Sequence, residues 1–137
     1  MPSYLLDTNI LSDLLNNPTG RVGKRIGAMS PQQRRNLYTS IVVAAEMRFG
    51  ALKRNSSVLA RRVEEILDWI EVLPLASGTD REYAKLRVQL ERRGRPIGGN
   101  DMLIAAHALS LGCVLVTDNV REFSRVHDLD IENWLRT

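Results

Sequence analysis

The sequence predicts an α/β fold with a mostly parallel central sheet flanked by helices. Short apolar runs of strand length, such as Tyr4–Leu6 and Cys113–Val116, alternate with longer segments of helical periodicity. Polar residues directly follow both runs. In parallel α/β folds, functional groups gather at the carboxyl ends of the strands, so these positions are the first candidates for a site.

The first 40 residues are expected to hold two strands and three helical segments. In chain order these are a strand at 4–6, helices at 10–15, at 19–29 and from 30 onward, and a strand at 37–39. The run Tyr4-Leu5-Leu6 ends at Asp7, which is typical of a buried strand. Ser30-Pro31 resembles a helix start, with serine as the cap and proline in the first turn.

The remainder of the chain continues the alternation. Expected elements are helices at 41–53, 57–71, 79–93 and 101–111, strands at 72–75, 113–116 and 129–131, and a glycine-rich turn at 95–100. Ser40 would cap the helix at 41–53. The helix at 57–71 is amphipathic, because its large apolar residues fall on one face. Gly112 occupies the position after a helix end that favours glycine.

Composition limits the class of protein. The chain has 137 residues, of which 44% are hydrophobic and 26% charged. These values predict one globular domain over 1–137 and exclude a disordered, collagenous or coiled-coil chain. Cys113 is the single cysteine, and His107 and His127 are the only histidines. A cysteine- or histidine-rich metal site is therefore excluded, and any metal would need oxygen ligands.

No stretch of the sequence is apolar enough to span a membrane, and the N-terminal residues lack the pattern of a secretory signal. We therefore expect a cytoplasmic protein without a membrane partner. The formal charge is +3, from 19 Lys and Arg against 16 Asp and Glu. This mildly basic balance is compatible with a nucleic-acid partner without requiring one.

Five polar side chains occupy positions that suggest chemistry. Asp7 follows the strand at 4–6, and Asp118 and Asn119 follow the strand at 113–116. Glu46 falls within the apolar face of its helix, and Asp101 opens a helix on a small-residue face. Each position also has an ordinary structural explanation. These are a helix cap for Asp7, a turn for Asp118 with Asn119, a buried arginine partner for Glu46 and a helix-dipole contact for Asp101.

Taken together, these side chains are expected to converge on one edge of the sheet. Closely packed carboxylates repel and raise each other's pKa values, and a divalent cation relieves that repulsion. Oxygen ligands suit Mg²⁺, with Mn²⁺ as a substitute, and Mg²⁺ takes only one or two carboxylates directly. The layout predicts metal-assisted hydrolysis of a phosphate ester.

Positive charge precedes Asp101 in the stretch RVQLERRGRPIGGND. Arg87, Arg92, Arg93 and Arg95 are interpreted as RNA-binding residues that hold a polyanion by its phosphates, although a solvated helix end would look the same. Four further cations would extend the patch: Lys24, Arg25, Arg34 and Arg35. The glycine pair at 98–99 would let the backbone approach the site closely.

Four segments together resemble the PIN-domain ribonucleases, and specifically the VapC toxins of type II toxin–antitoxin pairs. They are LLDTNILSDLL, SIVVAAEMRFGAL, GRPIGGNDMLIAAHAL and VLVTDNVREFSRVHDLDIENW. The similarity runs from Leu5 to about Trp134, with the motifs in the family's order. It implies a three-layer PIN fold. Asp7 and Asp101 match the family's magnesium ligands, and Glu46 matches its third acid.

The fourth acidic position of the family falls within VTDNVREF. The resemblance leaves either Asp118 or Asn119 in this role: the aspartate carries the only charge, whereas the asparagine stands where some relatives have the acid. An asparagine cannot act as a base but can bind a metal-bound water. Thr8 or Asn9, beside Asp7, and Thr117 would help to hold the site.

The resemblance implies a magnesium-dependent endoribonuclease that forms a homodimer and is silenced by a VapB-type antitoxin. Operator DNA would be bound only through the antitoxin complex. The TNILS and GRPIG motifs resemble the branch that cuts initiator tRNA.

Other functions are open to the sequence alone. A PIN-fold module that binds RNA without cutting it, and a PIN nuclease outside a toxin–antitoxin pair, are two alternatives. A haloacid-dehalogenase-like phosphatase also begins with a strand followed by aspartate, but it needs a second aspartate where this chain has Asn9. A receiver domain is disfavoured because no lysine follows a clear final strand.

Overall fold

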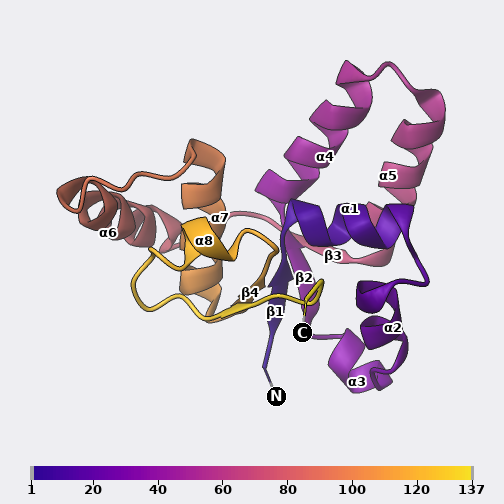
Figure 1. The fold of residues 1–137 in the computed structure, drawn as a ribbon, viewed down its shortest axis with the longest axis horizontal. Helices are drawn as coiled ribbons and strands as arrows, with labels where there is room; N and C mark the ends of the chain where they lie inside the picture. The colour runs from indigo at the N-terminus through magenta and orange to yellow at the C-terminus, as the bar shows by residue number, and fades with distance from the viewer. Residues whose placement is uncertain (1, 137) are drawn as a thin grey trace.

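The computed structural model describes residues 2–136 and is built around a five-stranded sheet (Figure 1). The strands lie in the order β3-β2-β1-β4-β5, and all four pairings are parallel. They are β1 (Tyr4–Leu6), β2 (Leu37–Ser40), β3 (Glu71–Leu73), β4 (Val114–Val116) and β5 (Ile131–Glu132). The predicted α/β class is confirmed, and the sheet is parallel throughout.

Helices cover both sides of the sheet. They are α1 (Thr8–Asn16), α2 (Arg21–Gly27), α3 (Pro31–Arg34), α4 (Ile41–Lys53), α5 (Ser57–Trp69), α6 (Thr79–Arg92), α7 (Gly99–Leu111) and α8 (Val120–Phe123). In Figure 1, α6, α7 and α8 lie to one side of the strands, and α1, α2 and α3 lie to the other. α4 and α5 rise together as a helical hairpin above α1.

Several helix ends follow directly from the sequence. The Ser30 hydroxyl accepts a hydrogen bond from the Gln33 backbone N–H at 3.2 Å, and the Gln33 side chain accepts one from the Ser30 N–H, which completes a capping box. The Ser40 hydroxyl accepts from the Val42 N–H at 3.1 Å. Gly112 adopts the left-handed conformation after α7, with φ of 67°. The predicted helix ends at these positions are confirmed.

The boundaries of other elements differ from the prediction. α1 begins at Thr8 rather than at 10, because Asp7 caps it. α5 ends at Trp69, and Glu71 already belongs to β3. α7 begins at Gly99, so it includes part of the predicted turn. The short helix α8 was not predicted.

The central strand β1 lies in the middle of the hydrophobic core. Leu5 and Leu6 are fully buried, as are Leu115 and Val116 of the neighbouring β4. Because β1 pairs with β2 on one side and β4 on the other, Asp7 lies at the middle of the carboxyl edge of the sheet. Among the described residues, no helix has the length and apolar character needed to cross a membrane.

Candidate active site

Asp7 is the most buried acid of the site. Its side chain is 4% exposed, and it follows β1 directly. The Thr117 hydroxyl donates to Asp7 Oδ2 at 2.8 Å, and the Thr8 backbone N–H donates to Oδ1 at 2.8 Å. Burial raises the pKa of Asp7 above its ordinary value, while these two hydrogen bonds oppose the shift and the charge of Glu46 adds to it. Asp7 is therefore both the predicted helix cap and a buried carboxyl with a raised pKa.

Glu46 lies on α4 and faces α1. The Thr8 hydroxyl donates to Glu46 Oε1 at 2.7 Å, which ties the carboxylate to the residue beside Asp7. The alternative of a buried arginine partner is wrong, since the structure shows no ion pair of Glu46 within residues 2–136. A glutamate with a single hydroxyl donor keeps its second carboxylate oxygen available.

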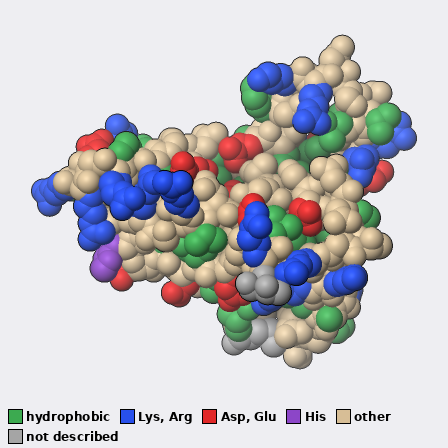
Figure 2. All heavy atoms as spheres, in the orientation of Figure 1, with side chains coloured by type: hydrophobic (Ala, Val, Ile, Leu, Met, Phe, Trp, Pro, Cys, Tyr) green, Lys and Arg blue, Asp and Glu red, His purple; other side chains and the backbone are tan. Residues whose placement is uncertain are grey.

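Asp101, in the first turn of α7, meets a carboxylate that the sequence interpretation did not select. The pKa of Asp101 is raised to about 7, mainly by partial burial, and then by a hydrogen bond to Glu122 and by the charges of Asp7, Glu122 and Glu46. Three acids, at the end of β1 and on α4 and α8, thus act on the carboxyl of Asp101 on α7. In Figure 2, acidic side chains lie in the notch between the α4–α5 hairpin and the α6–α7 half.

Glu122 belongs to the short helix α8, and Asn119 orients it. The Asn119 Nδ2 donates to Glu122 Oε2 at 3.0 Å, and the Asn119 backbone N–H donates to the Thr117 hydroxyl at 3.0 Å. A polar chain therefore runs from Asp7 through Thr117 and Asn119 to Glu122. A first-turn glutamate after a strand end was the available sequence signal, but four residues are too few for a periodic pattern.

The Asp118 carboxylate bonds to the C-terminal segment rather than to this cluster. Its Oδ1 accepts from Asn133 Nδ2 at 3.0 Å and from Arg136 Nε at 3.1 Å, and these bonds lower the pKa of Asp118. Its backbone N–H donates to Asn9 Oδ1 at 3.0 Å. The structure thus joins Asp118 to the C-terminal segment, and within residues 2–136 it shows no side-chain hydrogen bond between Asp118 and Asp7 or Asp101.

The acidic cluster supplies the oxygen ligands that Mg²⁺ prefers. Within residues 2–136, no three His, Cys, Asp or Glu side chains are arranged closely enough to enclose a metal ion. Mg²⁺ does not need such an enclosure, because it keeps several waters and takes one or two carboxylates. The two carboxyls with raised pKa values, Asp7 and Asp101, repel their acidic neighbours in the absence of a cation. The residues present therefore fit a hydrated divalent ion.

The arginines selected from the sequence form two groups. Arg87 donates to Glu91 Oε1 at 3.1 Å and to the Tyr83 hydroxyl at 3.0 Å, so its guanidinium is occupied. The other three, Arg92, Arg93 and Arg95, are exposed and form no ion pair with the described residues. Lys and Arg side chains gather over the α6 end of the molecule in Figure 2.

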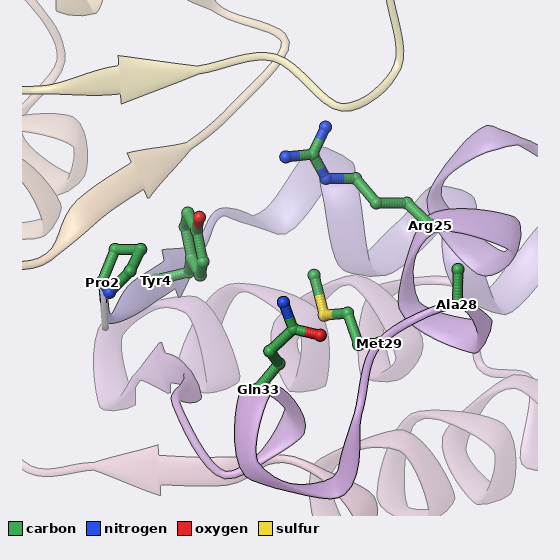
Figure 3. Close-up of a pocket in the computed structure, with 6 residues that line it drawn as sticks. All are labelled: Pro2, Tyr4, Arg25, Ala28, Met29 and Gln33. Atoms are coloured by element: carbon green, nitrogen blue, oxygen red, sulfur yellow. The ribbon is translucent and has the colours of Figure 1, made fainter.

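A hollow at the opposite edge of the sheet has no acids in its lining. Its volume is about 250 Å³, and Figure 3 shows its lining residues Pro2, Tyr4, Arg25, Ala28, Met29 and Gln33. Arg25 is already paired with Glu132 at 3.2 Å and stacks over the Trp134 ring at 4.6 Å. Because its charged group is occupied, this hollow is a weaker candidate for a site than the acidic cluster.

Comparisons with known proteins agree with the geometry. The sequence profile of the PIN domain matches residues 4–129. "Ribonuclease VapC1" of Haemophilus influenzae strain R2866 is 37% identical over 134 residues, covering 97% of this chain and 98% of the relative. The "tRNA(fMet)-specific endonuclease VapC" of Shigella flexneri is 34% identical over 139 residues, covering 98% and 99%.

A solved structure extends the similarity to the fold. The crystal structure of VapBC2 from Rickettsia felis, bound to a DNA fragment from the promoter, contains a chain that superposes with a TM-score of 0.86 at 30% identity. The match covers 96% of this chain and 98% of that chain.

Proposed function

The chain belongs to the PIN domain family, in its VapC branch, and from this premise we propose that it is a magnesium-dependent endoribonuclease and the toxin of a toxin–antitoxin pair. The observation that carries the proposal is the meeting of Asp7, Glu46, Asp101 and Glu122, where burial, followed by the hydrogen bond to Glu122 and the charges of the other three acids, raises the pKa of Asp101 to about 7. Such a set of acids is unfavourable without a cation, which is a reason for a metal-dependent reaction.

Asp7 and Asp101 would hold the metal. Asp7 is fixed on two oxygens by Thr8 and Thr117, so its orientation is set before any ligand binds. A bound Mg²⁺ would neutralise phosphate charge and acidify a water at neutral pH; Mn²⁺ is the expected substitute.

Glu46 would accept a proton from the attacking water, and Glu122 would interact with Asp101. The Thr8 hydroxyl fixes one oxygen of Glu46 and leaves Oε2 able to accept a proton from an attacking water. Asn119 fixes Oε2 of Glu122, which is the partner of Asp101. In this proposal Glu122 takes the fourth acidic role, and Asn119 acts as its positioning residue rather than as a base.

RNA would approach over the basic end of the molecule. Arg92, Arg93 and Arg95 are free to contact phosphates, which adds affinity without base specificity. The structure gives less support to Arg87 in this role, because Glu91 and Tyr83 occupy its guanidinium.

We further propose a VapB-type antitoxin as the protein partner. Solved relatives are VapBC complexes, one of them bound to promoter DNA, which supports operator binding through the complex. The Shigella flexneri relative named for tRNA(fMet) supports initiator tRNA as a substrate. A homodimer and a cytoplasmic location complete the proposal.

The decisive experiment is cleavage of RNA by the purified chain. We expect cleavage with Mg²⁺ or Mn²⁺, none with excess chelator, and recovery when Mg²⁺ is restored. Equal cleavage in chelator would refute the metal role. Binding of RNA without cleavage, with both metals and with several RNAs including initiator tRNA, would favour a non-catalytic RNA-binding module instead.

A paired substitution tests the fourth acidic position. Glu122→Gln is expected to lower the cleavage rate by about 100-fold, because it removes a charge from the cluster. Asp118→Asn should change the rate by less than about threefold but lower the melting temperature, since it weakens the bonds to Asn133 and Arg136. Rates and melting curves of both variants check this. The reverse pattern would return the role to Asp118.

A further inference from the structure

A hollow opens beside the acidic cluster, between α1, α4 and α5. Its volume is about 280 Å³, close to the lower end of the range of about 300–1,000 Å³ that small-molecule sites span. Thr8 and Glu46, which are joined by a 2.7 Å hydrogen bond, form part of its lining. A molecule in the hollow would therefore lie directly next to the acids.

The α1 wall of the hollow is uncharged and mostly polar, with Leu15 as its apolar member. Thr8, Ser12 and Asn16 recur every fourth residue, so they line one face of α1 along the hollow. The Thr8 hydroxyl is used by Glu46, but within residues 2–136 neither the Ser12 hydroxyl nor the Asn16 amide has a side-chain hydrogen bond. Together these two groups can donate and accept hydrogen bonds.

The α4 wall repeats the same spacing. Glu46, Gly50 and Arg54 follow one another at four-residue intervals, with glycine in the middle. A Cβ built on Gly50 would meet no atom within 4 Å outside its own helix backbone and chain neighbours, so the missing side chain leaves space. Met47 and Val63 add apolar surface. Arg54 is exposed and forms no ion pair with the described residues.

We propose that this hollow binds one nucleobase of the RNA, next to the bond that is cut; the proposal rests on the nuclease function above. Proteins read unpaired bases by apolar contact with the ring and hydrogen bonds to its edges. The hollow offers apolar surface and hydrogen-bonding groups. Arg54 lies at its far end, where it would contact a phosphate of the RNA. An apolar helix of a protein partner would find a row of polar groups along one wall, which favours RNA over protein.

Gly50→Leu is the sharpest test, because it fills the space without changing the acids. Leucine favours a helix more than glycine does, so the variant should fold. Gly27→Leu is the matched control, since a Cβ there also meets open space, on α2 and away from the hollow. Each protein would cut a pool of random-sequence RNA, and sequencing of the cut ends would give the base preference.

We expect Gly50→Leu to flatten or shift that preference and to lower kcat/KM by about tenfold or more on an RNA with the preferred sequence. The Gly27→Leu control should match the wild type. A second variant, Ser12→Ala with Asn16→Ala, removes the hydrogen-bonding groups without filling the hollow and should weaken the same preference. Unchanged preference in both variants overturns the proposal. If Gly50→Leu instead only abolishes inhibition by the antitoxin, the hollow binds the antitoxin and the nucleobase proposal is wrong.

Binding separates this proposal from the nuclease function. The same RNA is titrated against Asp101→Asn protein with and without Gly50→Leu. If the wild type cuts no RNA but Gly50→Leu weakens binding about tenfold, the nuclease function fails and the nucleobase site stands. If cleavage is metal-dependent and Gly50→Leu changes neither binding nor preference, the nuclease stands and the site fails. A chain that neither cuts nor binds RNA overturns both.

Discussion

Replacing Asp101 by asparagine is expected to abolish RNA cleavage and, without metal at pH 8, to raise the melting temperature of the protein. The loss of activity should reach about 10³-fold or more, because one of the two proposed metal ligands loses its charge. Stability should rise, because the substitution also removes a carboxylate that faces Asp7, Glu46 and Glu122. The same residue would thus serve catalysis at a cost to the fold.

The sign of the pH dependence follows from the raised pKa. With a pKa of about 7 in the folded protein, Asp101 keeps a proton that the unfolded chain has lost above about pH 4. Its favourable contribution is complete below the pKa of the unfolded chain and disappears as the pH rises through 7. Because Asp101 is only partly buried, we expect about 1 kcal/mol between the variant and the wild type at pH 8.

Thermal unfolding from pH 4 to pH 9 in chelator measures this difference. The melting temperature of Asp101→Asn should exceed that of the wild type by a few degrees at pH 8, and the gap should close near pH 4. Mg²⁺ should raise the melting temperature of the wild type only. Asp128→Asn is the control, because its carboxyl is exposed at the surface. A variant less stable than the wild type at pH 8 would contradict the proposed repulsion.

Asp7→Asn and Asp7→Ala should both lose about 10³-fold or more of the cleavage activity, but they should differ in stability. Asparagine can still accept the Thr8 N–H bond that caps α1, whereas alanine cannot. Loss of an N-cap costs about 1 kcal/mol, so Asp7→Ala should have the lower free energy of unfolding. Chemical denaturation and RNA cleavage together test both roles of this residue.

The outcome that separates these roles is the behaviour of Asp7→Asn. If it were inactive and also badly destabilised, the activity loss would reflect unfolding rather than the missing charge. A Thr117→Val control removes the hydroxyl that donates to Asp7 at 2.8 Å while keeping the side-chain shape, and it should reduce activity less than Asp7→Asn. Equal losses would mean that orientation matters more than charge.

Sequence reasoning located the parts of the site that follow from local patterns. The apolar run before Asp7, the caps at Ser30 and Ser40 and the apolar surroundings of Glu46 are all readable within a few residues. The parallel arrangement of β1 and β4 then brings Asp7 and Thr117 together, although they are 110 positions apart. These elements are determined by burial and capping, which the sequence displays directly.

Glu122, the fourth acid of the cluster, could not be predicted from the sequence, for a physical reason. Helix α8 has four residues, and the placement of Glu122 depends on the Asn119 side chain and on contact with Asp101. Asp118, the obvious charge in the same segment, is instead joined to Asn133 and Arg136 near the C-terminus. Tertiary contacts, and no local pattern, decide which side chain of this segment faces the cluster.

The central place of β1 has a consequence for biosynthesis. β1 is translated before its partner β4 and the glutamate of α8, which follow it by more than a hundred residues. A nascent polypeptide shorter than that holds Asp7 without the groups that complete its surroundings. The proposed active site is therefore completed only after translation has passed β4 and α8.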